Sequence, residues 1–169
     1  MGLCSILHQI TCKLTLEYLN SGYEWVIDID IEQFFDKVNH DKLIQILREQ
    51  VNNSSVLNLI SKYLGAGVME KGIVKATKTG VPQGGPISVI LSNVYLDKLD
   101  KELEGRGLRF VRYADDVLIF TKSEVAANRV MASISSWIER KLFLKVNVTK
   151  SKVVRPTRSK YLGFTFLKN

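Results

Sequence analysis

The spacing of hydrophobic residues changes along the chain between the period of a helix and that of a strand. Apolar residues recur every three or four positions over residues 3–18, which predicts an amphipathic helix that ends before Ser21. Residues 24–32 alternate instead, with tryptophan and isoleucine on one face and mostly acidic residues on the other. This alternation predicts a half-buried strand whose second face is unusually acidic.

Helical spacing returns twice in the next part of the chain. One helix is predicted from about Asn39, and a second helix is predicted to be capped by Ser54 or Ser55. Residues 69–79 have the rhythm of strands, interrupted at residues 71–72, and this pattern predicts a hairpin.

A turn-rich segment, residues 80–86, leads into the longest predicted helix, which ends near Gly105. The apolar positions of this helix fall on one face, as in a helix that packs against a core. We expect the following residues to be buried: Ile87, Ile90, Leu91, Val94, Tyr95, Leu99 and Leu103.

Two short strands, residues 109–113 and 117–121, follow this helix, and Ser123 caps a further helix. Strands near residues 145–154 and 160–167 complete the chain. Without the insertions, the order is strand, helix, strand, strand, helix, strand. This order predicts an α+β fold with a ferredoxin-like βαββαβ core, to which further helices and a hairpin are added.

The composition is that of one folded domain. The chain has 169 residues, of which 46% are hydrophobic, so it can form a core and is not a disordered chain. It contains no apolar run of about 18 residues and no secretory signal, and we therefore expect a cytoplasmic protein without membrane contact. Cys4 and Cys12 are about 12 Å apart along one helix, too far for a disulfide. His8 and His40 have no partner at metal-ligand spacing.

The positive charge is concentrated in one segment. The net charge is +7, and residues 141–160 contain seven basic residues and no acidic one: Lys141, Lys145, Lys150, Lys152, Arg155, Arg158 and Lys160. An unopposed positive segment favours the phosphate backbone of a nucleic acid. A solvated pair of charged strands is the alternative interpretation.

Three carboxylates are candidates for chemistry. Asp115 and Asp116 lie in the turn between two apolar strands, and Asp30 lies on the acidic face of the first strand, with Asp28 as its alternative. Carboxylates that converge in this way repel one another unless divalent cations neutralise them. Two such cations are what phosphoryl transfer requires. A hairpin turn alone would also account for the adjacent pair, because aspartate is common in turns.

Six stretches of the chain, in a fixed order, resemble the reverse transcriptases encoded by bacterial group II introns. They are residues 22–36, 39–43, 81–88, 110–116, 147–152 and 161–164, which span nearly the whole chain from Gly22. The resemblance implies a polymerase palm that performs RNA-directed DNA synthesis by two-metal nucleotidyl transfer. It also implies an RNA template (intron RNA), a DNA primer and deoxynucleoside triphosphates as partners.

We expect residues 1–169 to be the palm domain, without the start of the fingers and without the thumb and maturase regions of full-length members. The isolated palm is then expected to be weakly active or inactive and to associate as a homodimer through uncovered faces. Val89 also departs from the family, since many relatives have proline there. A non-catalytic RNA-binding or assembly module is the alternative function, and a nucleotide cyclase is a remote third.

The resemblance assigns the metal ligands by residue. It implies that Asp30, Asp115 and Asp116 hold two Mg²⁺ ions, with the backbone carbonyl of Ile31 completing the shell. In the family the first aspartate stands five residues before an aromatic residue, and Asp30 and Phe35 have this spacing.

The resemblance also implies nucleotide-binding residues, which are Phe35, Gln83, Gly84, Tyr113 and Lys150. The ring of Phe35 would exclude a 2′-hydroxyl group, whereas Phe34 is the better candidate for core packing. Lys152 is close enough to be confused with Lys150. The predicted contacts to nucleic acid are Lys145, Lys152, Arg155, Arg158 and Lys160. We interpret Asp36 and Asp41 as helix-start and capping residues rather than ligands.

Overall fold

A four-stranded antiparallel sheet lies at the centre of the protein. The computed structural model describes residues 3–66, 68–70, 73–75, 78–82, 85–158, 160–161 and 164–165. The strands of the sheet follow the order β4-β5-β1-β6. Their bounds are Trp25–Ile29 for β1, Arg109–Tyr113 for β4, Asp116–Thr121 for β5 and Lys152–Val154 for β6.

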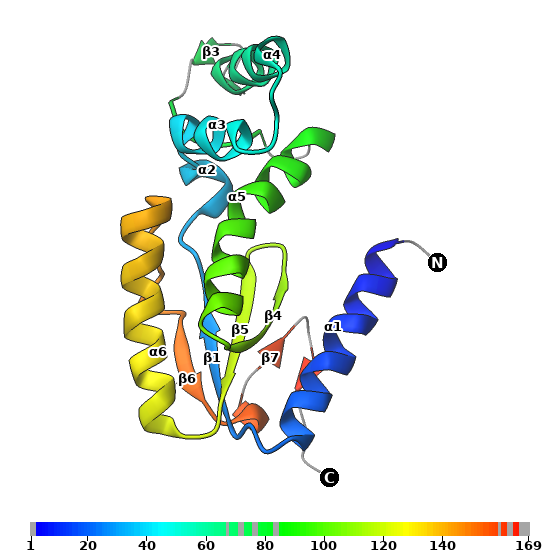
Figure 1. Ribbon diagram of the computed structural model, residues 1–169, viewed down its shortest axis with the longest axis vertical. Helices are drawn as coiled ribbons and strands as arrows, with labels where there is room; N and C mark the ends of the chain where they lie inside the picture. The colour runs from blue at the N-terminus through cyan, green and yellow to red at the C-terminus, as the bar shows by residue number, and fades with distance from the viewer. Residues whose placement is uncertain are drawn as a thin grey trace.

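Two long helices connect these strands and cover one face of the sheet. Helix α5 (Pro86–Gly105) follows β1 and precedes β4, and α6 (Glu124–Trp137) links β5 to β6 (Figure 1). Their buried residues form one core with the inward residues of the sheet, such as Ile27 and Ile119. The strand order and the two helices are those of a ferredoxin-like core, so the predicted α+β fold is confirmed.

The other face of the sheet is covered by α1 (Leu3–Asn20). Val26 is fully buried there in a second core, against which Tyr18 of α1 packs. The rings of Tyr18 and Phe120 have centroids 5.4 Å apart. The expectation of a half-buried strand is therefore wrong for the start of β1, because α1 supplies an apolar cover that the alternation does not reveal.

The predicted inward face of α5 is correct except near its start. Leu91, Tyr95, Leu99 and Leu103 are buried, whereas Ile90 is 62% exposed. The buried face of the first turns passes instead through two small polar residues, Ser88 and Ser92. The helix therefore buries serines where the sequence pattern favours isoleucine, because the period of 3.6 residues places position 90 on the outer side.

A smaller group of elements extends beyond one end of the sheet (Figure 1). It consists of α2 (Phe34–Lys37), α3 (His40–Arg48), α4 (Ser54–Gly65), β2 (Val68–Glu70) and β3 (Ile73–Lys75). Strands β2 and β3 pair antiparallel, so the predicted hairpin is confirmed. In the part of the chain that the structure describes, no helix is both long enough and apolar enough to span a membrane.

The helix starts of this group follow the rules of capping. Asp36 and Asp41 lie in the first turns of α2 and α3, as predicted for helix-start residues. Helix α4 is capped by Asn53 rather than by Ser54 or Ser55. The Oδ1 atom of Asn53 accepts hydrogen bonds of 3.0 and 3.1 Å from the backbone amides of residues 55 and 56. Because the backbone at residue 53 is extended, the Asn53 side chain can reach these amides. The N-cap therefore lies one residue before the predicted Ser54.

The C-terminal strands are shorter than predicted. Helix α6 continues into a π-helical turn, η1 (Ile138–Leu142), and of the strand expected near residues 145–154 only β6 and an isolated bridge between Ile31 and Val146 form. A short 3₁₀ helix, η2 (Pro156–Arg158), follows β6. The last expected strand is instead divided into two short strands, β7 (Lys160–Tyr161) and β8 (Phe164–Thr165), which pair antiparallel.

Candidate active site

The register of the sheet brings two of the predicted aspartates together. Strand β1 pairs antiparallel with β5, and Ile29 lies opposite Val117. Continuing this register by one residue places Asp30, at the end of β1, opposite Asp116. Asp115 precedes Asp116 in the turn that joins β4 to β5. The sheet therefore gathers the three predicted carboxylates at one end of two adjacent strands.

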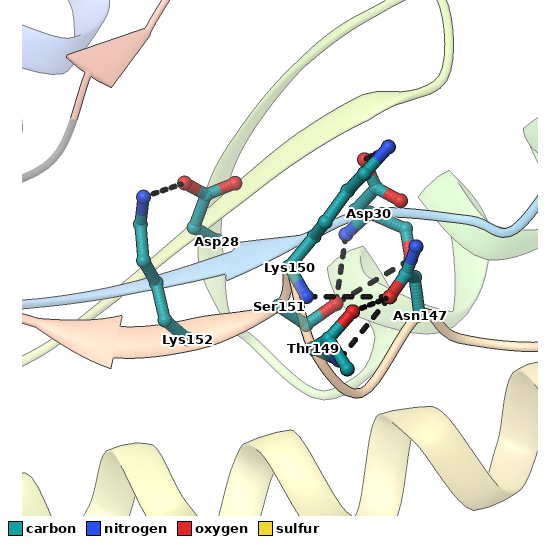
Figure 2. A network of polar contacts seen from close by, with 7 residues as sticks. All are labelled: Asp28, Asp30, Asn147, Thr149, Lys150, Ser151 and Lys152. Carbon is teal, nitrogen blue, oxygen red and sulfur yellow. Dashed lines mark hydrogen bonds and ion pairs between the residues drawn. The ribbon is translucent and has the colours of Figure 1, made fainter.

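A loop from the C-terminal part of the chain holds the backbone of Asp30 (Figure 2). The Asp30 amide donates a hydrogen bond of 3.0 Å to the Ser151 Oγ, and the Asp30 carbonyl accepts one of 2.8 Å from the Asn147 amide. The Asn147 Oδ1 accepts hydrogen bonds from Thr149 and from the Lys150 amide. Residues 147–151 therefore form a compact turn fastened to the end of β1.

Sequence reasoning assigned no role to Asn147 or Ser151. Asn147 could have been recognised as the start of an Asx-turn, because an asparagine side chain often accepts hydrogen bonds from the backbone amides two and three residues later. No local signal identifies Ser151, because its partner, Asp30, lies far away in the sequence.

One open cavity of about 490 Å³ collects several of the predicted residues. Its lining includes Asp30, Ile31, Phe35, Asp115 and Lys150. The Lys150 Nζ lies 3.8 Å from the Asp30 Oδ2, and the lysine side chain is 69% exposed. Carboxylates, an aromatic ring and an exposed ammonium thus face the same space, a combination that suits a charged nucleotide.

The carboxylates are close enough to affect one another. Burial raises the pKa of Asp116, and the negative charges of Asp115, Asp28 and Asp30 raise it further. Burial also raises the pKa of Asp28, against the lowering effect of the Lys152 ammonium. The site therefore stores electrostatic repulsion that a cation would relieve.

The carboxylates do not form a complete ligand cluster. Among the residues that the structure describes, no group of three or more His, Cys, Asp or Glu side chains is placed to hold a metal ion. Lysine ammonium groups supply positive charge instead, with Lys152 Nζ 3.5 Å from Asp28 Oδ2 and Lys150 beside Asp30. The donor atoms are carboxylate oxygens, which suit Mg²⁺ chemically, but their arrangement is not that of a preformed site.

The two adjacent phenylalanines have different environments. Phe34 is buried at 2% exposure, as predicted for a core residue. Phe35 is only partly buried and packs edge-on against Phe34, with ring centroids 5.2 Å apart. Phe35 lines the site cavity and also a second cavity of about 500 Å³, which Tyr113 and Ser92 line as well.

The segment that leads toward Gln83 and Gly84 lies against Phe35, although Gln83 and Gly84 themselves are outside the described residues. The Val81 amide donates a hydrogen bond of 2.7 Å to the Phe35 carbonyl. Gly80 has a φ of +93°, and a Cβ atom there would lie 3.1 Å from the Asp36 carbonyl oxygen. Glycine is therefore required at position 80 by both its conformation and the close backbone approach.

The basic segment is not unopposed. Lys150 and Lys152 face Asp30 and Asp28, and the Arg155 Nη1 lies 2.6 Å from the Glu24 carboxylate. The Arg155 guanidinium also lies over the ring of Trp25, 4.5 Å from its centroid. The acidic face of the first strand and the basic segment thus neutralise each other in part, which the one-dimensional charge count could not show.

The structure describes the remaining predicted contacts to nucleic acid only in part. Lys145 lines a cavity of about 250 Å³ together with Phe143 and Lys37. Arg158 lies in η2 and Lys160 in β7, and their side chains are outside the described residues.

Comparisons with known proteins place the chain in a family. The model of the family described as "Reverse transcriptase (RNA-dependent DNA polymerase)" matches residues 4–166. The putative COX1/OXI3 intron 2 protein of Saccharomyces cerevisiae is 33% identical over 86% of the chain, which covers 16% of that protein. The group II intron-encoded protein LtrA of Lactococcus lactis subsp. cremoris is 33% identical over 62% of the chain and 18% of its own length.

A solved structure shows the same fold at greater distance. A telomerase from Candida tropicalis in complex with the TWJ fragment of telomeric RNA superimposes with a TM-score of 0.70 at 16% identity, over 97% of this chain and 32% of that one. The chain spans about half the length of protein YkfC of Escherichia coli and less of the other relatives named above. These matches confirm the resemblance to group II intron proteins, and the chain belongs to the reverse transcriptase family.

Proposed function

We propose that residues 1–169 form the palm of a group II intron reverse transcriptase and that the cavity at the end of β1 is its nucleotidyl-transfer site. The observation that carries this proposal is that Asp30, Asp115, Phe35 and Lys150 line one cavity. In the proposed reaction, the 3′-hydroxyl of a primer attacks the α-phosphate of a deoxynucleoside triphosphate on an RNA template. The bond between the α- and β-phosphates breaks, and pyrophosphate leaves.

The proposed metal ligands are the carboxylates of Asp30, Asp115 and Asp116, with the Ile31 carbonyl. Their hard oxygen donors suit Mg²⁺, and a cation would offset the burial and the neighbouring carboxylate charges that raise the pKa of Asp116. When bound, such ions lower the pKa of the attacking hydroxyl and neutralise the leaving pyrophosphate. The register of β1 and β5, continued by one residue beyond Ile29 and Val117, supports a position of Asp30 opposite Asp116.

The other residues position the nucleotide. Phe35 would contact the sugar and exclude a 2′-hydroxyl by volume, with Gln83, Gly84 and Tyr113 around the base and sugar. Lys150 is exposed and pairs with Asp30, and in the proposed reaction its ammonium turns from Asp30 to the triphosphate. Lys145, Lys152, Arg155, Arg158 and Lys160 are the proposed contacts to template and primer.

The proposed setting is the cytoplasm, where an RNA template and deoxynucleotides are available. We further propose that the chain by itself associates as a homodimer. Large apolar side chains on its surface support this, notably Leu59 at 69% exposure and Ile90 at 62%. Light scattering at micromolar concentration is expected to give twice the 19.1 kDa mass, and a monomer would remove this part of the proposal.

Primer extension tests the reaction directly. The chain is incubated with Mg²⁺, deoxynucleotides and a primed RNA or DNA template, with Asp30→Asn as the inactive control. We expect slow extension, at least about tenfold below a full-length relative, because misplacement of reactants by about 1 Å can reduce the rate about a hundredfold. RNA retention in a filter assay without any extension, even with Mn²⁺, would favour a non-catalytic RNA-binding module instead.

A further inference from the structure

Arg112, on β4, binds three groups at once. Its side chain is only 13% exposed. The Nε and Nη2 atoms donate hydrogen bonds of 2.8 and 2.6 Å to the two carboxylate oxygens of Asp100. Nη1 donates hydrogen bonds of 3.1 Å to the Asn93 Oδ1 and 2.8 Å to the Ala114 carbonyl. The guanidinium thus uses four of its five N–H groups in one planar arrangement that an ammonium cannot reproduce.

The carbonyl that Arg112 binds belongs to an unusual residue. Ala114 has a φ of +55°, in the left-handed region that a non-glycine residue adopts only when its surroundings impose it. It immediately precedes Asp115 and Asp116 in the turn between β4 and β5. A hydrogen bond to the Ala114 carbonyl therefore fixes the peptide plane from which the two aspartates extend.

The other partners of Arg112 lie on α5. Asp100 and Asn93 are two helical turns apart on this helix, whose inward face is part of the main core. The turn is therefore held by a helix of the main core as well as by its own hairpin. Arg112 therefore ties the turn between β4 and β5 to α5.

We propose that Arg112 is a positioning residue, which holds the Ala114 peptide against α5 and thereby places Asp115 and Asp116 for cation binding. The metal-binding part of this inference rests on the proposed function. Arg112 would act through the Ala114 peptide rather than as a ligand, and Asp100 and Asn93 would hold its guanidinium in place.

The test compares Arg112→Lys with Arg106→Lys. Arg106 is a matched control, because it also binds a carboxylate, that of Glu102 on α5, at 2.7 and 2.6 Å, but lies away from the turn. Amide hydrogen exchange of residues 113–116 reports the order of the turn, and a Mn²⁺ titration reports cation affinity. The melting temperature of each variant shows whether the fold is retained.

We expect Arg112→Lys to raise the dissociation constant for Mn²⁺ by about 10- to 100-fold, the usual effect of losing a group that supports a ligand. Exchange in the turn should rise at least about tenfold, while Arg106→Lys changes neither quantity. Asp100→Asn should act in the same direction, and the double variant should add little to Arg112→Lys, because both residues belong to one network.

Unchanged Mn²⁺ affinity in both Arg112→Lys and Asp100→Asn would overturn the proposal, as would an equal loss in Arg106→Lys. If Arg112→Lys fails to fold, Asp100→Asn alone decides. A parent chain that binds no Mn²⁺ would remove the proposed metal site, and the exchange rates would then decide separately whether Arg112 holds the turn.

Discussion

The two segments that flank Asp30 are held in different ways. The turn of residues 113–116 is fixed through the nearly buried Arg112 to a core helix. The loop of residues 147–151 is fixed to the backbone of Asp30, while its Lys150 side chain is 69% exposed. We infer a division of roles, in which a core helix anchors the turn that carries Asp115 and Asp116, whereas the Lys150 ammonium is exposed beside Asp30.

The largest effect is expected from removing a carboxylate of the turn of residues 113–116. Asp115→Asn should weaken Mn²⁺ binding by more than about a hundredfold, because the loss of a direct ligand exceeds the 10- to 100-fold effect of losing a supporting group. Asparagine is also favourable in turns, so the melting temperature should not fall. Calorimetric titration measures the affinity, and binding as tight as that of the parent would show that Asp115 is not a ligand.

The adjacent phenylalanines separate a role in the site from a role in the core. Phe35→Val should raise the acceptance of ribonucleotides relative to deoxynucleotides by about 10- to 100-fold, since relief of a clash is worth about 1–3 kcal/mol. The ratio of ribonucleotide to deoxynucleotide binding, and of incorporation where extension is measurable, gives the effect.

Phe34→Ala is the matched control for this experiment. It should lower the free energy of unfolding by about 3–5 kcal/mol, because Phe34 is buried, and leave the sugar preference unchanged. An unchanged sugar preference in Phe35→Val, together with a large drop in stability, would assign Phe35 to the core as well.

In the loop of residues 147–151, Lys150→Met should reduce binding of a triphosphate by about tenfold, equivalent to about 1.4 kcal/mol. Stability should change by less than about 0.5 kcal/mol, because the ion pair with Asp30 is exposed. Fluorescence titration with a nucleotide and thermal melting measure the two quantities. A large loss of stability with intact nucleotide binding would mean that Lys150 is a structural residue.

The smallest effect concerns pH. The pKa of Asp116 in the folded chain is raised above its ordinary value of 3.8. At a pH between the unfolded pKa and the folded pKa, the folded state therefore binds a proton more readily than the unfolded state. Stability therefore falls as the pH rises through this window and stays at the lower level at neutral pH. Asp116→Asn should raise the melting temperature slightly at pH 7, and the gain should vanish below the unfolded pKa.

Thermal melting over a series of pH values checks this prediction. Asp97→Asn is the control, because the Asp97 side chain is 41% exposed and pairs with Lys101, and its loss should give no gain at any pH. A gain that persists at low pH would show that the effect of Asp116→Asn is not electrostatic.

The order of the elements could be predicted from the sequence alone, because hydrophobic periods and turn residues are local. The sequence could not show that Val26 is buried by α1, since the residues that cover a sheet face are distant in the chain. The same limit applies to the pairing of Arg155 with Glu24 and of Ser151 with Asp30, which depends on the register of β1 and β6. The burial of Ser92 in place of Ile90 reflects the rotation of one helix, which composition does not fix.

The position of β1 in the sheet has a consequence for synthesis of the chain on the ribosome. Both neighbours of β1, strands β5 and β6, are translated long after it. Until Thr121 has left the exit tunnel, both edges of this apolar strand lack their native partners, and one edge stays open until Val154 has emerged. Such a nascent chain folds late and is exposed to wrong pairing, so its yield in a cell should depend on chaperones more than on the stability of the finished fold.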